Sequence, residues 1–156
     1  MAGGTDALTP DGVVVGHDGS HRCDAVVLRA AGLARRLGLP LHVVRVWSLA
    51  TAPRPASRTT TYVPPLADFE QAVVADLRGD VDRLGADPLA GVEVHLHAVK
   101  GQQVAERLLA AAQGAEMLVI GARGAGGFPG LHLGSTVSQV VRHSPVPVLV
   151  VPNAPA

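Results

Sequence analysis

Short apolar runs alternate with longer amphipathic segments along almost the whole chain, and this alternation limits the folds open to it. The predicted strands are residues 13–17, 41–47, 91–99, 116–121 and 146–151, and the predicted helices are residues 20–38, 66–86, 101–114 and 135–144. The apolar runs are rich in Val, Ile and Leu, which is typical of strands buried on both faces of a parallel sheet. In the helical segments, apolar residues recur at spacings of three and four. We therefore expect a single α/β domain, with a five-stranded parallel sheet and helices on both faces.

Two polar turns that contain glycine follow the first and fourth predicted strands. They are GHDGS at residues 16–20 and GARGAGG at residues 121–127. In an open parallel sheet, ligands bind beyond the carboxyl ends of the strands, where the winding direction reverses. If the first and fourth strands are neighbours, both turns border one crevice.

The composition of the chain argues against several classes of partner. Its 156 residues, of which 47% are hydrophobic, fit one domain, and 13 basic residues balance 13 acidic ones. A net charge of zero and an aromatic content of 3% argue against nucleic acid and against an acidic membrane surface as partners. One cysteine, the lack of an apolar run of membrane-spanning length and a start without signal-peptide features favour a cytoplasmic protein.

The glycine-rich stretch of residues 121–136 indicates a phosphate-binding loop, although two familiar motifs are missing from the chain. A Walker A loop needs a lysine directly before Ser or Thr, and the one lysine, Lys100, precedes Gly-Gln. A dinucleotide fingerprint needs G-x-G-x-x-G after the first strand, and GHDGSH does not supply it. What remains is Gly121-x-x-Gly124, nine further residues, and Gly134-Ser135-Thr136.

This remaining pattern has a physical use. Gly121 and Gly124 would let the backbone approach a ligand closely, at positive φ where the turn requires it. Gly134, also at positive φ if the turn demands it, would lead into a helix whose first N–H groups form an anion site. Ser135 and Thr136 would add hydroxyl donors. The alternative is an ordinary flexible loop, with Ser135 as the N-cap of the helix.

The pattern G-2x-G-9x-G-S/T on the fourth strand-to-helix turn resembles the nucleotide-binding signature of the universal stress protein family. The resemblance covers nearly the whole chain, because VVVGHDGS, LHVVRVW and HSPVPVLVVP match the family at the first, second and last strands. It implies the strand order 3-2-1-4-5 and an adenine nucleotide alpha hydrolase-like fold. The domain would span residues 11–152, between a flexible tail at residues 1–10 and a second tail at residues 153–156.

The resemblance also implies a homodimer that binds ATP together with Mg²⁺ and regulates a stress response through a protein partner that the sequence does not identify. In the implied order the last strand is an edge of the sheet. Because this strand is short and very apolar, we expect it to pair with its own copy across the dimer axis.

The family's residue roles carry over position by position. Asp18 would hydrogen-bond the ribose or adenine, and Val46 would pack on the adenine. The other roles are shaping of the turn for His17 and Gly19, contact with ribose and phosphates for Gly121 and Gly124, and contact with the phosphate chain for Gly134, Ser135 and Thr136. Arg123, between the two glycines, could reach the phosphates and partly replace the missing lysine. The family often has Pro or Thr where this chain has His17. Asp18 could instead cap the following helix, and Arg123 could be an ordinary exposed arginine.

Several other features have a functional and a purely structural interpretation. His95 and His97 share one strand face at a spacing that a metal could use, but without a third ligand we interpret them as structural or exposed. Cys23 is interpreted as a small buried residue and Trp47 as core or rim packing. The segment 48–65 is longer than most strand-to-helix loops, so it is either a mobile surface loop or a lid or partner-binding segment.

The sequence contains no evident catalytic constellation and no evident metal site. We therefore favour a nucleotide-gated regulator over an enzyme. Two alternatives stay open: a slow ATPase or phosphate- or adenylate-transferring protein, and a nucleotide-free dimeric scaffold.

Overall fold

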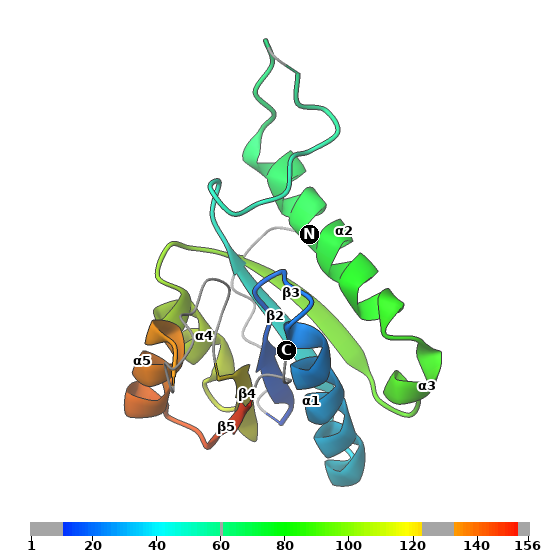
Figure 1. Cartoon of the computed structure of the whole chain (residues 1–156), viewed down its shortest axis with the longest axis vertical. Coiled ribbons are helices and arrows are strands. Elements are labelled where there is room, and N and C mark those ends of the chain that lie inside the picture. The colour runs from blue at the N-terminus through cyan, green and yellow to red at the C-terminus, as the bar shows by residue number, and fades with distance from the viewer. Residues whose placement is uncertain (1–10, 60, 123–132, 153–156) are drawn as a thin grey trace.

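A sheet of five parallel strands runs through the centre of the molecule in the order β3-β2-β1-β4-β5 (Figure 1). The computed structural model describes residues 11–59, 61–122 and 133–152. The strands are β1 Val13–Gly16, β2 Leu41–Trp47, β3 Val94–Lys100, β4 Met117–Gly121 and β5 Val148–Val151. All four neighbouring pairs are parallel, which confirms the predicted α/β class and the predicted strand order.

Helices cover both faces of this sheet (Figure 1). They are α1 Cys23–Leu37, α2 Leu66–Arg83, α3 Ala86–Leu89, α4 Val104–Ala112 and α5 Ser135–His143. Side chains of α1 and α2 pack with Val13 and Val15 on one face, and side chains of α4 and α5 pack with Val14 on the other. The central strand β1 is therefore buried on both sides, as its uninterrupted run of valines predicts.

Helices α1 and α2 are each followed closely by a glycine at positive φ, where the chain turns. Helix α1 ends at Gly38, whose φ of 67° suits a residue without Cβ. After α2, Gly85 has a φ of 90° and separates the four-residue helix α3 from it. The prediction of one helix over residues 66–86 is therefore wrong at its end, because the chain turns at Gly85. The third strand also begins at Val94 rather than at residue 91, since Gly91 turns the chain at a φ of 77°.

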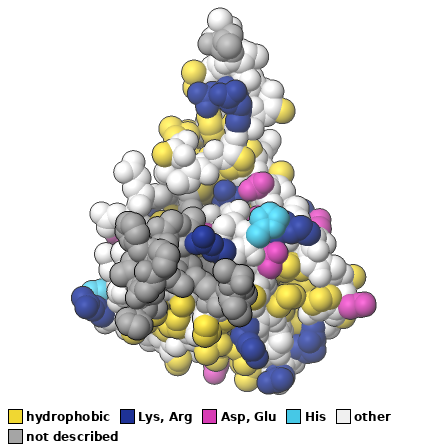
Figure 2. Space-filling model, in the orientation of Figure 1, with side chains coloured by type: hydrophobic (Ala, Val, Ile, Leu, Met, Phe, Trp, Pro, Cys, Tyr) yellow, Lys and Arg dark blue, Asp and Glu magenta, His cyan; other side chains and the backbone are white. Residues whose placement is uncertain are grey.

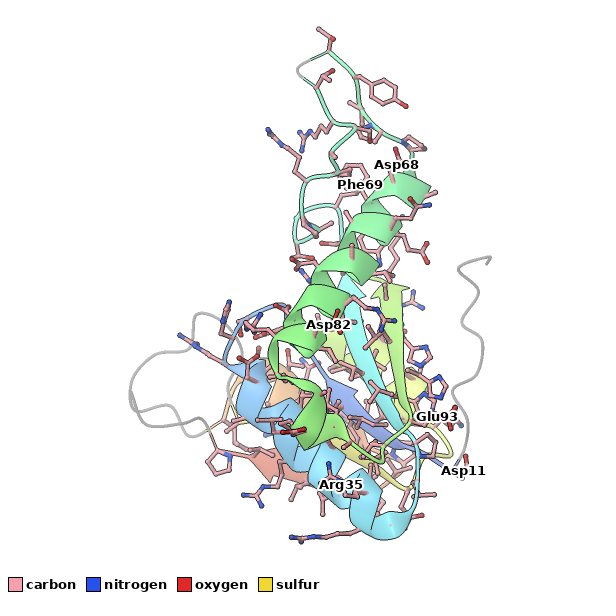
Figure 3. All side chains as sticks on the ribbon, turned by 90° about the vertical axis from the view of Figure 1, so that its right-hand side faces the viewer. Asp11, Arg35, Asp68, Phe69, Asp82 and Glu93 are labelled. Carbon is pink, nitrogen blue, oxygen red and sulfur yellow. The ribbon has the colours of Figure 1, made fainter. Side chains whose placement is uncertain are left out.

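The segment 48–65 leaves β2 and projects from the body of the molecule together with the start of α2 (Figure 1). Its base is anchored, because Ala52 packs against a buried cluster of Trp47, Phe69 and Val73. Further along, Ser57 Oγ donates a hydrogen bond of 2.9 Å to Asp68 Oδ2 on α2. Figure 3 shows Asp68 and Phe69 at this end of α2, beside the segment. In the part of the chain that the structure describes, no helix combines the length and the apolar character needed to cross a membrane.

Candidate functional site

A cavity of about 340 Å³ lies at the carboxyl ends of the strands, where three strand-to-helix connections meet the end of β4 and the start of α5. The β1–α1 turn contributes a polar wall. A second wall comes from β2 and the start of segment 48–65. The rest of the lining comes from the β3–α4 turn, α4, the end of β4 and the start of α5. Its lining residues are Gly16, His17, Asp18, Arg22, Cys23, Val26, Arg45, Val46, Ser48, Thr51, Gly101, Gln102, Val104, Leu108, Ile120, Gly121, Thr136 and Val137. Apolar side chains thus make one part of the wall, and polar groups of the turns make the rest.

The structure brings half of the predicted site residues into this wall. They are His17, Asp18, Val46, Gly121 and Thr136. Gly19, Gly134 and Ser135 belong to the adjoining turns but are not among the lining residues. Arg123 and Gly124 lie outside the described residues, so their predicted contacts remain predictions.

Asp18 holds the β1–α1 turn together. Its Oδ1 accepts hydrogen bonds from the backbone N–H of Ser20 at 2.8 Å, from the hydroxyl of Ser20 at 2.6 Å and from the thiol of Cys23 at 3.1 Å. The N-cap of α1 is Arg22, so Asp18 does not occupy the capping position that the sequence allowed it. Asp18 therefore shapes the turn and at the same time lines the cavity.

Two observations explain why position 19 is a glycine: its backbone conformation and the closeness of the Arg45 side chain. Its φ is 85°, and a Cβ at this position would lie 2.8 Å from the guanidinium carbon of Arg45. Arg45 is 6% exposed and forms an ion pair with Asp76 of α2. Sequence reasoning missed Arg45 as a cavity residue, although a single arginine inside the apolar strand LHVVRVW was a usable signal.

His17 lies beneath the turn, and its side chain is only 1% exposed. Its Nδ1 accepts a hydrogen bond of 3.0 Å from the N–H of Gly19, so in the neutral ring the proton is on Nε2. Nε2 faces Oδ2 of Asp80 at 4.0 Å. Burial lowers the pKa of His17, and the carboxylates of Asp80, Asp18 and Asp24 oppose that effect.

Asp80 is the buried acidic partner that the sequence did not reveal. Its Oδ1 accepts a 2.8 Å hydrogen bond from Arg83, whose guanidinium also reaches Asp24 on α1. Its Oδ2 is buried and has no hydrogen-bond partner within the described residues. Asp80 is far from His17 in the chain, so only the tertiary structure could bring the two together.

The start of α5 contradicts one of the two sequence interpretations. Gly134 is the N-cap, with a φ of −72°, and its N–H donates to the carbonyl of Ala122 at 3.0 Å. Ser135 is the first residue of the helix, so the alternative in which Ser135 is the N-cap is wrong. Neither Gly134 nor Gly121 has a positive φ, and any residue could adopt the backbone conformation of Gly134.

A second group of polar side chains, three histidines, lies on one face of the sheet formed by β2 and β3. His42 and His97 form a 2.9 Å contact between Nδ1 and Nε2, and the ring of His42 stacks on that of His95 with 5.0 Å between centroids. We call these three residues the histidine cluster. His95 also contacts Glu93 at 2.9 Å, and Figure 3 shows Glu93 at this edge of the sheet. The expectation of a structural role for His95 and His97 fits these contacts, and His42 is the member that sequence reasoning missed.

Cys23 and Trp47 both lie in the interior, as predicted. Cys23 is 8% exposed, and burial together with the Asp18 carboxylate raises the pKa of its thiol to about 12. Trp47 is 2% exposed.

Comparison with protein families and curated proteins identifies a consistent set of relatives. A family model described as the universal stress protein family matches residues 11–152. The chain is 36% identical over 151 residues to the universal stress protein Rv1996 of Mycobacterium tuberculosis, covering 92% of this chain and 45% of Rv1996. It is 32% identical over 156 residues to Rv2319c of the same organism, covering 96% and 50%. The chain therefore spans about half the length of the curated relatives it matches.

Solved structures share the same architecture. A universal stress protein in complex with cAMP is 25% identical, with a TM-score of 0.66 over 92% of this chain and 98% of that one. The UspA protein of Lactobacillus plantarum is 21% identical, with a TM-score of 0.65 over 92% and 99%, and supports the fold alone. The fold is the adenine nucleotide alpha hydrolase-like fold of these neighbours.

Proposed function

The chain belongs to the universal stress protein family, and we propose that it binds ATP in the cavity at the carboxyl ends of its strands. The observation that supports this proposal is the meeting of an apolar wall, a carboxylate and a helix N-terminus around one space of about 340 Å³. That volume lies within the range of about 300–1,000 Å³ that is usual for small-ligand sites.

The adenosine part of the ligand would occupy the region between Val46, Leu108 and Ile120. These apolar side chains offer a surface on which a purine ring can pack. Asp18 is exposed at the rim of the same space, and a carboxylate accepts hydrogen bonds from ribose hydroxyls or from the adenine amino group. His17 and Gly19 hold the turn that carries Asp18.

The phosphates would lie toward the first turn of α5. The first N–H groups of a helix have no partner within the helix and favour an anion. Thr136 lines the cavity at this turn, and Ser135 and Gly134 adjoin it. Arg123 and Gly124 complete the proposed phosphate site, and Mg²⁺ would be held mainly by the phosphates themselves, as this ion commonly is.

A relative with bound nucleotide supports an adenine ligand. The solved universal stress protein that is 25% identical to this chain was in complex with cAMP. Our preference for ATP over cAMP rests on the glycine signature and its proposed phosphate contacts. Because segment 48–65 begins at the cavity with Ser48 and Thr51, nucleotide binding would alter its packing and regulate a protein partner.

Nucleotide released from the purified, denatured protein, identified by mass spectrometry, tests this function. Recovery of ATP supports the regulator. ADP together with measurable turnover identifies a slow ATPase instead. If nothing is recovered and calorimetry detects no binding of ATP, cAMP or adenosine, the nucleotide proposal is wrong and the scaffold is favoured.

We also propose that β5 forms the homodimer. The carbonyls of Pro147 and Val151 accept hydrogen bonds from the N–H groups of Leu118 in β4 and of Ala122 directly after it. Successive residues of a strand direct their backbone groups to opposite sides, so Val148 and Val150 direct theirs away from β4. An antiparallel copy of β5 could bond these groups and close the edge.

Two substitutions at one position test this interface. Val150→Pro removes the outward N–H, whereas Val150→Ala loses the side chain and keeps that N–H. We expect light scattering to give the mass of a dimer for the parent and Val150→Ala, and of a monomer for a folded Val150→Pro. A dimer in all three proteins would place the interface elsewhere.

A further inference from the structure

Three potential metal ligands converge in the wall of the cavity. One ring nitrogen of His17, one carboxylate oxygen of Asp18 and Sγ of Cys23 all lie within 4.8 Å of one another. His17 and Asp18 follow β1 directly, and Cys23 is the first residue of α1, so one rigid turn presents all three. All three residues also line the cavity, which gives a cation and its water a route to them.

Asp18 and Cys23 share a single proton. The thiol of Cys23 donates to Asp18 Oδ1, and the distance between Sγ and Oδ1 is 3.1 Å. A tetrahedral zinc ion with bonds of about 2.3 Å to sulfur and about 2.0 Å to oxygen would separate those two atoms by about 3.5 Å. A cation could therefore replace the shared proton if the pair widened by about 0.4 Å.

Asp80 lies on the side of His17 where a metal-bound histidine usually has its outer partner, at a distance that must shorten before a hydrogen bond forms. Such histidines donate their second ring N–H to a carboxylate or a carbonyl, which fixes the tautomer and the ring orientation. Nε2 of His17 faces Oδ2 of Asp80 at 4.0 Å, and that oxygen is buried and has no other partner within the described residues. Asp80 is 9% exposed, so this unsatisfied carboxylate oxygen is held inside the protein toward the ligand set.

We propose that His17, Asp18 and Cys23 form a site for a thiophilic divalent cation such as Zn²⁺. The cation would bind His17 Nδ1, Asp18 and the Cys23 thiolate, with water from the cavity as fourth ligand. The Cys23 proton leaves to solvent, and the carboxylate and thiolate then neutralise the two positive charges of the ion. A thiolate and an imidazole favour zinc over magnesium or calcium, which prefer oxygen ligands.

The local surroundings are compatible with a cation. Gly19 would give up its hydrogen bond to Nδ1, and because Gly19 is a partly exposed residue, water could replace that partner. Two arginines, Arg22 and Arg45, also line the wall, and Asp76 holds the charge of Arg45 in an ion pair. The proposal does not depend on the proposed nucleotide function, because the cation is tested without nucleotide.

Cobalt provides the test, because a thiolate bound to Co²⁺ gives a near-ultraviolet charge-transfer band. The chain contains one cysteine, so such a band can come only from Cys23. We expect the full chain to bind one Co²⁺ with this band, at a stoichiometry that does not change with protein concentration. Added Zn²⁺ should remove the band by displacement.

Variants then separate this site from the histidine cluster. A folded Cys23→Ser protein should lack the band, and Asp80→Asn should keep it but bind Co²⁺ about 10–100-fold more weakly. An unchanged melting temperature for Asp80→Asn would show that the loss concerns the metal rather than the fold. The double variant His95→Ala/His97→Ala removes the competing imidazoles and should bind cobalt like the parent.

Three results would overturn the proposal. One is the absence of a charge-transfer band in the parent protein, a result that needs no variant. Another is a band that needs two chains per metal, since that indicates intermolecular binding. The last is zinc affinity that falls in the double histidine variant but not in Cys23→Ser, because the histidine cluster would then be the metal site.

Discussion

The β1–α1 turn buries the imidazole ring of His17 and the histidine cluster buries that of His42, but carboxylates lie around the first ring and imidazoles pack against the second. His17 in the turn has carboxylates around it, and Asp80, Asp18 and Asp24 all raise its pKa against the effect of burial. His97 in the cluster has only imidazole neighbours that shift it, and burial with His42 and His95 lowers its pKa to about 4. The carboxylates around His17 therefore favour a positive charge there, whereas the imidazole neighbours of His97 disfavour one.

Their positions in the sheet explain this difference. The turn lies beyond the carboxyl end of β1, where side chains leave the sheet and open into a cavity. The cluster lies on the strands themselves, where His42 is opposite His95 in the register of β2 and β3. Polar residues at the end of a parallel strand can serve a ligand, whereas the histidines within β2 and β3 contact mainly one another.

The largest expected effect is a loss of folding stability, and it comes from adding one methyl group in each region. A Cβ at Gly12 would lie 2.5 Å from His42 Cδ2, and a Cβ at Gly19 would meet Arg45 at a φ of 85°. We expect Gly12→Ala and Gly19→Ala each to lower the free energy of unfolding by about 2–3 kcal/mol. Urea denaturation measures this loss.

A third glycine serves as the control. Gly32 lies inside α1, and its added Cβ would meet nothing within 4 Å, so Gly32→Ala should stabilise the protein by about 0.5–1 kcal/mol. Nucleotide and cobalt binding should suffer in Gly19→Ala only. Equal loss of binding in Gly12→Ala would contradict the independence of the two regions.

The next effect concerns ATP affinity at the start of α5. Thr136 lines the cavity and Ser135 does not, so Thr136→Val should weaken ATP more than Ser135→Ala. Loss of one hydroxyl donor to a charged group costs about 1.5–3 kcal/mol, or about ten- to a hundredfold in affinity. Asp18→Ala should weaken both ATP and adenosine, whereas Thr136→Val should spare adenosine.

Calorimetric titration of folded variants with both ligands provides this measurement. Asp82→Ala controls for the loss of one carboxylate, because Asp82 is exposed on α2 (Figure 3). Gly134→Val should fold normally, because the φ of Gly134 is −72°. If folded Thr136→Val, Ser135→Ala and Gly134→Val all bind ATP like the parent, the phosphate assignment is wrong.

Acid should also destabilise the protein through the histidine cluster, by less than the glycine substitutions do. The pKa of His97 falls from the ordinary 6.5 to about 4 on folding, so the unfolded chain binds a proton first as the pH falls. The contribution of His97 is complete above pH 6.5 and decreases as the pH drops toward 4. Because the ring is partly exposed, we expect a loss of about 1–2 kcal/mol over that window.

Substitution of His97 isolates this contribution. His97→Asn should flatten the dependence of the urea midpoint on pH between 6.5 and 4. His17 remains in both proteins, so its own titration cancels in the comparison. An unchanged slope in His97→Asn would mean that the cluster does not titrate as its stacking implies.

The smallest expected effect is a change in hydrogen exchange in segment 48–65 when ATP binds. Its base lines the cavity through Ser48 and Thr51, whereas its outer part projects from the body. Hydrogen exchange should slow several-fold at residues 48–52 when ATP is added, with little change at the projecting tip. Equal rates with and without ATP would remove any role as a lid.

The surface around these regions is less informative than their interior. Figure 2 shows acidic and basic side chains dispersed over the visible face, as the net charge of zero suggests. Among the described residues on that face, no large area of a single charge calls for a charged partner.

The sequence predicted the sheet well because apolar runs report burial directly. β2 was predicted at its observed bounds, since LHVVRVW is flanked by Pro40 and by the polar Ser48. Strand order, by contrast, came from the family resemblance, because periodicity does not determine which strands are neighbours. The break at Gly85 was missed, since a positive φ leaves no mark on the pattern of apolar residues.

The candidate site was predicted in part, because His17, Asp18, Val46, Gly121 and Thr136 were all predicted and line the cavity. His17 and Asp18 were found because they follow a strand directly. Arg45, Asp80 and His42 were missed, because their importance depends on contacts between elements that are distant in the chain. Such contacts require the tertiary structure.

The burial of Trp47 gives this protein a built-in optical signal. The chain has one tryptophan, so all indole fluorescence comes from a side chain packed against Phe69 and Val73 beneath the base of segment 48–65. Its carbonyl accepts a 2.8 Å hydrogen bond from Gly101, which lines the cavity. Emission should therefore lie at the short wavelengths of an apolar environment, and it should respond to an occupied cavity as well as to unfolding. Events in the cavity can thus be followed in real time with no label attached.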